Sequence, residues 1–144
     1  MQIFHLVYHS RATYDLQSED LSKILSSSKR QNLKNEISGF LVYRDNYFLQ
    51  LLEGTEANVY ETLDRIKKDP RHASIQVIGE YLSEDRIVLD WNMALVDSKG
   101  IANSARGLIE LFEVAREGRV FDTQDALKLL LKKFSKDATI LQEY

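Results

Sequence analysis

Hydrophobic and polar positions follow two different periods along the first two thirds of the chain. Apolar residues at every second position predict β-strands, whereas apolar residues spaced three and four positions apart predict amphipathic helices. The two periods occur in the order strand, helix, strand, strand, helix, strand, strand. The predicted strands lie at residues 2–9, 36–43, 47–52, 74–81 and 87–96, and the predicted helices lie at 18–32 and 56–68.

This order predicts an α+β fold of the ferredoxin-like kind, in which a β-α-β-β-α-β-β chain forms one sheet with two helices on one face. Residues 103–116 and 123–134 carry apolar residues at helical spacing, so we expect a C-terminal helical pair on the other face. We therefore divide the chain into a domain at residues 1–97 and a C-terminal helical extension at 98–144. Because the apolar faces exceed what two short helices can cover, we also expect a homo-oligomer.

The hairpin at residues 36–54 contains the most unusual position of the pattern. Its two apolar runs are joined by the turn residues at 44–46, and both faces of the second run are apolar. A strand of this kind is expected to be central in the sheet and covered on both sides. Gln50 interrupts one of these apolar faces. Since a buried amide must be hydrogen-bonded, we expect a polar group to lie against Gln50.

The first helix has a similar anomaly at its C-terminal end. Ser18 is expected to cap the helix, and its apolar stripe begins at Leu21. The same stripe reaches Ser28 and Asn32, where an amphipathic helix should still be apolar. Two hydrogen-bonding side chains there indicate a polar ligand beside the helix, and the alternative is a helix end that dips into water.

Composition excludes several classes of protein. The chain has 144 residues, a formal charge of −3 and no Cys, so disulfides, thiolate metal sites and Cys nucleophiles are absent. No membrane span, signal peptide or strong basic patch is visible, and we expect a cytoplasmic protein that binds neither membrane nor nucleic acid. The histidines lack ligand spacing, so no metal site is expected, and His5 and His9 are assigned a structural or surface role. Motifs of hydrolases, P-loop proteins and dinucleotide-binding enzymes are also absent, which predicts that the chain is not an enzyme.

A charged segment follows the second helix, in the sequence RIKKDPRH. Asp69 precedes Pro70, and the residue before a proline avoids the helical conformation, so the helix should end there. Arg and His side chains in such a loop can bind phosphate, whereas a solvated charge run is the ordinary alternative. Together with the polar positions above, the candidate ligand slot comprises Tyr8, Ser28, Asn32, Gln50, Arg65, Asp69, Arg71 and His72.

At these residues the chain strongly resembles the BLUF family, the blue-light receptors that hold a flavin in a ferredoxin-like domain. The resemblance covers residues 1 to 97. It is carried by Tyr8 at the end of the first strand, SSSKRQN at 26–32, EISGFLVYRDNYFLQLLEG at 36–54, DPRH at 69–72 and WNM at 91–93.

The resemblance implies a non-covalently bound FAD, with FMN or riboflavin as further flavins that the slot could accept. Ser28 and Asn32 match the family's flavin-holding side chains on the first helix, and Gln31 stands where relatives often have Asn or His. The charged segment would then meet the ribityl and phosphate tail, through Arg65, Asp69, Arg71 and His72.

The resemblance also implies a photochemical mechanism. Excited flavin takes an electron from Tyr8, the phenolic proton moves through Gln50, and Gln50 is left rotated or tautomerised after recombination. The absorption then shifts to the red, and the last strand carries the signal through Trp91 or Met93 to a separate downstream signalling protein.

Two other classes of protein compete with the photoreceptor interpretation. An RNA-binding sheet of the RRM kind shares the element order, but the net acidity and the missing Gly-aromatic signature count against it. A flavin-dependent redox enzyme would need an open face for its substrate, and no residue set supplies one.

Overall fold

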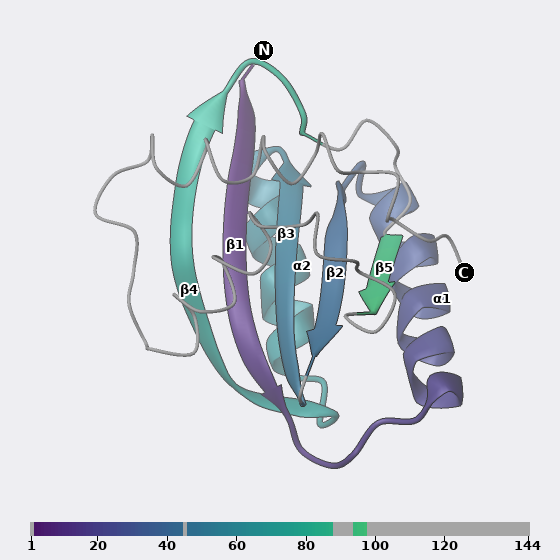
Figure 1. Cartoon of the computed structure of the whole chain (residues 1–144). Helices are drawn as coiled ribbons and strands as arrows, with labels where there is room; N and C mark the ends of the chain where they lie inside the picture. Colours follow the sequence, from purple (N-terminus) through teal and green to yellow (C-terminus); the bar gives the residue numbers. More distant parts are fainter. Residues whose placement is uncertain (1, 45, 88–93, 98–144) are drawn as a thin grey trace.

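The computed structural model describes residues 2–44, 46–87 and 94–97. The expected tail helices, the extension from residue 98 and the relay candidates Trp91 and Met93 lie outside these ranges. Seven elements follow one another along the described chain (Figure 1). They are β1 (Ile3–Ala12), α1 (Ser18–Lys34), β2 (Ser38–Arg44), β3 (Tyr47–Gly54), α2 (Glu56–Lys67), β4 (His72–Ser83) and β5 (Ala94–Asp97).

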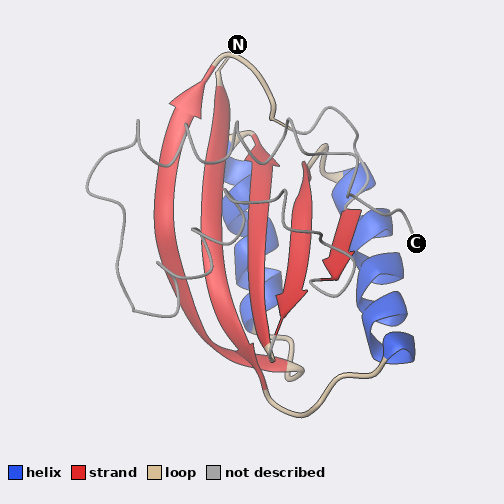
Figure 2. Cartoon of the chain, viewed as in Figure 1, coloured by secondary structure: helices blue, strands red, loops and turns tan. Residues whose placement is uncertain are grey.

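The strands form one sheet in the order β4-β1-β3-β2-β5. The pairs among β1 to β4 are antiparallel, whereas β5 pairs with β2 in parallel. Both helices lie on the same face of this sheet (Figure 2). The α+β ferredoxin-like architecture expected from the sequence is therefore confirmed.

β3 is the central strand, as its two apolar faces predicted. It lies between β1 and β2, and every residue from Phe48 to Gly54 is buried. The β1–β3 register pairs Tyr8 directly with Gln50. β2 also approaches β3 closely, because Gly39 has a φ of 154° and a Cβ there would lie 1.9 Å from the Leu51 carbonyl oxygen. Only glycine fits this position without a backbone shift.

The main hydrophobic core fills the space between the helices and the sheet. Fully buried side chains from the two layers meet there, among them Leu6, Leu25, Leu52 and Val59. Burying an aliphatic side chain of this size stabilises a fold by roughly 1.5–3 kcal/mol. This packing fixes the positions of α1, β1 and β3, which carry most of the polar side chains considered below.

Several element ends differ from the sequence-based prediction. The N-cap of α1 is Gln17 rather than the expected Ser18. The Gln17 backbone N–H donates to Asp20 Oδ2 over 2.9 Å. The expected Ser18 cap is wrong by one position because the Asp20 carboxylate, in the first turn, satisfies the preceding N–H. β4 is longer than expected and starts at His72, whereas the last strand is described only at Ala94–Asp97.

Within the described ranges, no helix combines the length and the apolar character that crossing a bilayer requires.

Candidate functional site

A pocket of about 230 Å³ lies between the two helices and the sheet. All nine polar residues singled out from the sequence line it, although they come from five different segments of the chain. They are Tyr8 on β1, Ser28, Gln31 and Asn32 on α1, Gln50 on β3, Arg65 on α2, and Asp69 and Arg71 in the connection before β4 together with His72 at its start.

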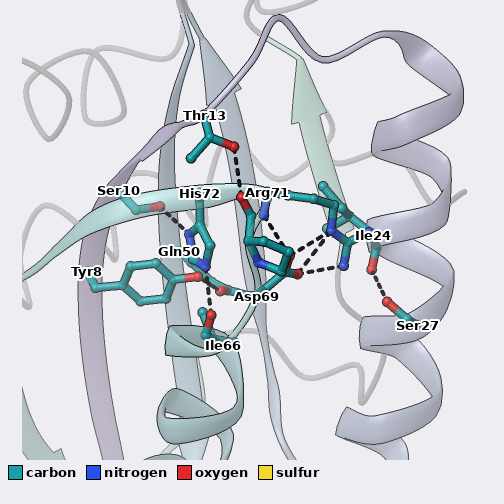
Figure 3. Close-up of polar contacts among 11 residues, drawn as sticks. Tyr8, Ser10, Thr13, Ile24, Ser27, Gln50, Ile66, Asp69, Arg71 and His72 are labelled. Atoms are coloured by element: carbon teal, nitrogen blue, oxygen red, sulfur yellow. Dashed lines mark hydrogen bonds and ion pairs between the residues drawn. The ribbon is translucent and has the colours of Figure 1, made fainter.

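Tyr8 and Gln50 are in direct contact at the sheet wall of the pocket. The Tyr8 hydroxyl donates a hydrogen bond to the Gln50 side-chain oxygen, and both residues are buried (Figure 3). The polar group that the sequence required beside Gln50 is therefore Tyr8. Since the two residues are partners in the β1–β3 ladder, the backbone itself holds their side chains together on one face.

The environment of Tyr8 keeps its phenol protonated. Burial raises the pKa of Tyr8 above its ordinary value, and the negative charge of Asp69 raises it further. A phenol that remains protonated can donate its hydrogen bond to Gln50 over the whole physiological pH range. Tyr8 is therefore a hydrogen-bond donor at rest.

Three side chains of α1 turn hydrogen-bonding groups toward the pocket. Asn32 is only 2% exposed, yet its amide has no hydrogen-bond partner among the described residues. Ser28 and Gln31 likewise make no side-chain hydrogen bond within the described part of the chain. The Asn32 amide borders the pocket, so the arrangement suits a polar ligand that donates to and accepts from it.

The charged residues at the pocket edge are only partly paired. Arg71 forms a fork with Asp69, in which Nη2 donates to Oδ2 over 2.6 Å and Nε donates to Oδ1 over 2.9 Å (Figure 3). Burial alone would raise the pKa of Asp69, but the hydrogen bonds and charge of Arg71 outweigh burial and lower it. Arg65 is half-buried at the pocket, and its side chain has no ion pair or hydrogen bond with any other described residue. Its guanidinium is available to an anionic group of a ligand.

His72 is tied into the protein by both ring nitrogens. Nε2 lies 2.8 Å from the Ile66 carbonyl oxygen, which can only accept, so Nε2 carries a proton. Nδ1 lies 2.7 Å from the Ser10 hydroxyl. His72 therefore presents its ring, rather than a free nitrogen, to the pocket.

Five further residues of the described chain line the pocket without having been predicted, namely Ile24, Ser27, Leu41, Phe48 and Ile66. Two of them had a visible signal. Phe48 shares a strand face with Gln50, and Leu41 is the partner of Gln50 in the β2–β3 ladder. The described residues contain no group of three His, Asp or Glu side chains that could hold a metal ion.

The arrangement suits a planar, partly apolar ligand with hydrogen-bonding edges. Leu41, Ile24 and Ile66 offer apolar walls, and Asn32 offers a donor and an acceptor in one plane. A ligand in this position also lies beside the Tyr8–Gln50 hydrogen bond.

Comparisons with known proteins identify related sequences and folds. The family model described as BLUF, sensors of blue-light using FAD, matches residues 3–94. Photoactivated adenylate cyclase subunit beta of Euglena gracilis is 30% identical over 98 residues, which are 67% of this chain and 11% of that protein. The blue light- and temperature-regulated antirepressor BluF of Escherichia coli (strain K12) is 33% identical over 70 residues, which are 49% of this chain and 17% of that protein. The chain thus spans only a small part of these relatives.

Solved structures of similar length show the same fold. The dark-state structure of BlrB, a BLUF protein, superimposes with a TM-score of 0.77 at 25% identity, over 94% of this chain and 97% of BlrB. The photo-activated state of BlsA gives a TM-score of 0.74 at 28% identity, over 94% of this chain and 95% of BlsA. The chain belongs to the BLUF family of blue-light sensors that use a flavin.

Proposed function

We propose that this chain binds FAD non-covalently in the pocket and signals blue light through the hydrogen bond between Tyr8 and Gln50. The observation that carries the proposal is this bond itself, which joins a protonated phenol to a carboxamide in the pocket wall. An amide has a donor end and an acceptor end, so a change in its orientation or tautomer reverses what it offers to its neighbours.

The chain's own residues fit the ring system of a flavin. Asn32 would pair with the adjacent carbonyl and N–H at the ring edge, because its unpaired amide presents one acceptor and two donors. Ser28 and Gln31 lie on the same helix and would add hydrogen bonds to this grip. Gln31 stands where relatives often have Asn or His, and its amide still offers a donor and an acceptor at that position.

The tail of the cofactor would leave the pocket beside the charged residues. The volume of about 230 Å³ is below the roughly 300–1,000 Å³ of typical ligand pockets, so it fits the ring rather than the whole dinucleotide. Arg65 would meet a phosphate, and the Asp69–Arg71 fork would bind a hydroxyl or phosphate of the tail. His72 would contribute its ring face, since both of its nitrogens have protein partners. FMN and riboflavin share the ring and could also bind.

A bound flavin supplies the absorption of blue light and the site that takes up one electron. Tyr8 would give up that electron, and its phenolic proton would move through Gln50, whose side-chain oxygen accepts the Tyr8 hydrogen bond. When the charges recombine, Tyr8 would regain the electron and the proton, so no net redox change would remain. Gln50 is left rotated or tautomerised, and its new hydrogen-bond pattern is the signal.

The output of the domain would pass by contact to a separate protein. The named relatives include a photoactivated adenylate cyclase and an antirepressor, which shows that related domains occur in proteins with different activities. We propose Trp91 or Met93 as the relay from the sheet, with a homo-oligomer as the signalling unit and no catalytic role for the domain itself.

Two substitutions test this proposal. Tyr8→Phe removes the hydroxyl and keeps the ring, and Gln50→Leu keeps the volume and removes the amide. We expect both variants to bind flavin and to lose the reversible red shift of the absorption spectrum under blue light. Tyr60→Phe is the matched control, because the Tyr60 hydroxyl bonds to Glu80 outside the pocket. A normal photocycle in either pocket variant would show that the proton route is wrong.

A further inference from the structure

A buried polar cluster lies on the face of the sheet opposite to the pocket. Strand alternation directs Gln50 of β3 toward the pocket and Glu53 toward the other face. Glu53 is completely buried. A buried carboxylate is costly unless charged or polar groups surround it, so its partners identify what the cluster holds together.

Three segments of the described chain contribute contacts to the Glu53 carboxylate. The buried His5 of β1 places Nε2 2.9 Å from Oε2, and the Ser38 hydroxyl of β2 donates to Oε1 over 3.2 Å. The third contact comes from the chain after β4, where the Ile87 backbone N–H donates to Oε2 over 2.5 Å. A charge-assisted hydrogen bond of this kind is among the stronger ones in proteins.

Arg86, the residue before Ile87, attaches the same segment through hydrogen bonds to three further acceptors. Its Nη1 donates to the Glu53 carbonyl oxygen over 3.0 Å and to Ser38 Oγ over 2.7 Å. Its Nη2 donates over 3.0 Å to the carbonyl oxygen of Glu36, in the loop between α1 and β2. The side chains of Glu53 and Arg86 therefore hold residues 86–87 against β3, β2 and the loop between α1 and β2.

Two of the residues that hold this segment, Glu53 and Glu36, lie close in the chain to residues of the pocket. Glu53 is three positions from Gln50 on β3, about 10 Å along the strand. The loop that carries Glu36 is tied to Asn32, whose carbonyl oxygen accepts the Ile37 N–H over 2.8 Å. Residues 86–87 in turn begin the connection from β4 to β5 at the opposite edge of the sheet.

We propose that Glu53 and Arg86 form an anchor that holds the start of the β4–β5 connection to β3. Through this anchor, a new orientation or tautomer of the Gln50 amide alters the β4–β5 connection. The proposal rests on the function proposed above. It assigns Glu53 and Arg86 a positioning role, since neither residue lines the pocket.

The register of the sheet provides the physical link. Tyr8 and Gln50 are partners across β1 and β3, and so are His5 and Glu53. A new hydrogen-bond pattern at the first pair changes how β1 and β3 sit against each other, which displaces the Glu53 carboxylate relative to its partners. The Ile87 N–H depends on that carboxylate, so its protection from solvent reports the state of the anchor.

Hydrogen–deuterium exchange at the Ile87 amide tests the anchor in the flavin-loaded protein, in the dark and under blue light. In the dark, Glu53→Gln is expected to speed this exchange by roughly 10- to 100-fold, the loss of one charge-assisted hydrogen bond. Arg86→Gln should also speed the exchange of the Ile87 amide. Because this variant keeps the Glu53 carboxylate, it serves as the test if Glu53→Gln folds poorly. Glu61→Gln and Arg30→Gln remove the same charges from exposed positions and should leave the exchange unchanged.

In the wild-type protein, blue light should change the Ile87 exchange rate together with the red shift. In both anchor variants the red shift should persist, while the light-dependent change at Ile87 disappears. A wild-type protein that shifts to the red with no change at Ile87 would overturn the inference and leave the proposed function intact. Anchor variants with the dark exchange rate of their controls would overturn it as well. A wild-type protein without any red shift would instead refute the proposed function, and the dark comparison would still decide whether the anchor exists.

Discussion

Replacing Asn32 by alanine isolates the part of flavin binding that depends on one amide. Asn32 is buried in the pocket wall, and its side chain has no hydrogen-bond partner among the described residues. The substitution therefore breaks no side-chain hydrogen bond that the structure describes. Its backbone bond to Ile37 is unaffected, and alanine is the better helix former. The variant should fold as well as the wild-type protein does.

The expected loss of affinity follows from the two hydrogen bonds that Asn32 would make to the ring edge. A hydrogen bond contributes a net 0.5–1.5 kcal/mol, so two contribute about 1–3 kcal/mol. At about 1.4 kcal/mol per tenfold change, the dissociation constant for flavin should rise about 5- to 150-fold. Ser28→Ala removes a single hydroxyl and should raise it by about 2- to 13-fold.

The assay is a titration of ligand-free protein with riboflavin and with FAD, followed by quenching of flavin fluorescence. Ser27→Ala is a matched control, because Ser27 also lines the pocket but its hydroxyl already donates to the Ile24 carbonyl oxygen over 3.1 Å. This control should change the affinity less than about threefold. If Asn32→Ala binds flavin as the wild-type protein does, or if Ser27→Ala loses as much, the assignment of α1 as the ring-holding helix is wrong.

Three further predictions concern the tail, the fold and pH. Arg65→Gln should weaken binding of FAD by about tenfold and leave riboflavin binding unchanged, since only FAD carries phosphates; equal losses for both flavins would place the tail elsewhere. Gly39→Ala should lower the free energy of unfolding in urea by at least about 2 kcal/mol, because its Cβ would collide with the Leu51 carbonyl, and near-wild-type stability would contradict the close strand contact. Burial lowers the pKa of His9, so the unfolded chain binds more protons near the ordinary value of 6.5 and stability should fall as the pH drops through it. His9→Leu should flatten that decline, and an unchanged slope would show that His9 is not its source.

The sequence predicted the pocket well because its polar residues interrupt apolar patterns. Gln50 lies in an otherwise buried strand, and Asn32 lies on the apolar stripe of α1, so each required a polar neighbour. The direct pairing of Tyr8 with Gln50 could not be derived from either strand alone. It depends on the register between β1 and β3, which long-range packing sets.

The far-face cluster was not predicted, and its residues gave little signal. Glu53 is next to the hairpin end, where a carboxylate is ordinarily solvated, and Arg86 lies in a short segment without a hydrophobic period. The burial of Glu53 and the partial burial of Arg86 result from contacts between segments more than 30 residues apart. The prediction of a strand beginning at 87 also missed that Ile87 uses its N–H outside the sheet ladder, to bind a side chain.

The ladder pairing of Tyr8 with Gln50 has a consequence for evolution of such sensors. The two side chains to which we assign the photochemistry are spaced by the hydrogen bonds of adjacent strands, not by a loop whose length or sequence can change. Insertions, deletions and new domains at the periphery leave that spacing unaltered. One light-detecting core can therefore be combined with unrelated effectors, because each new arrangement keeps the same two side chains at the same spacing.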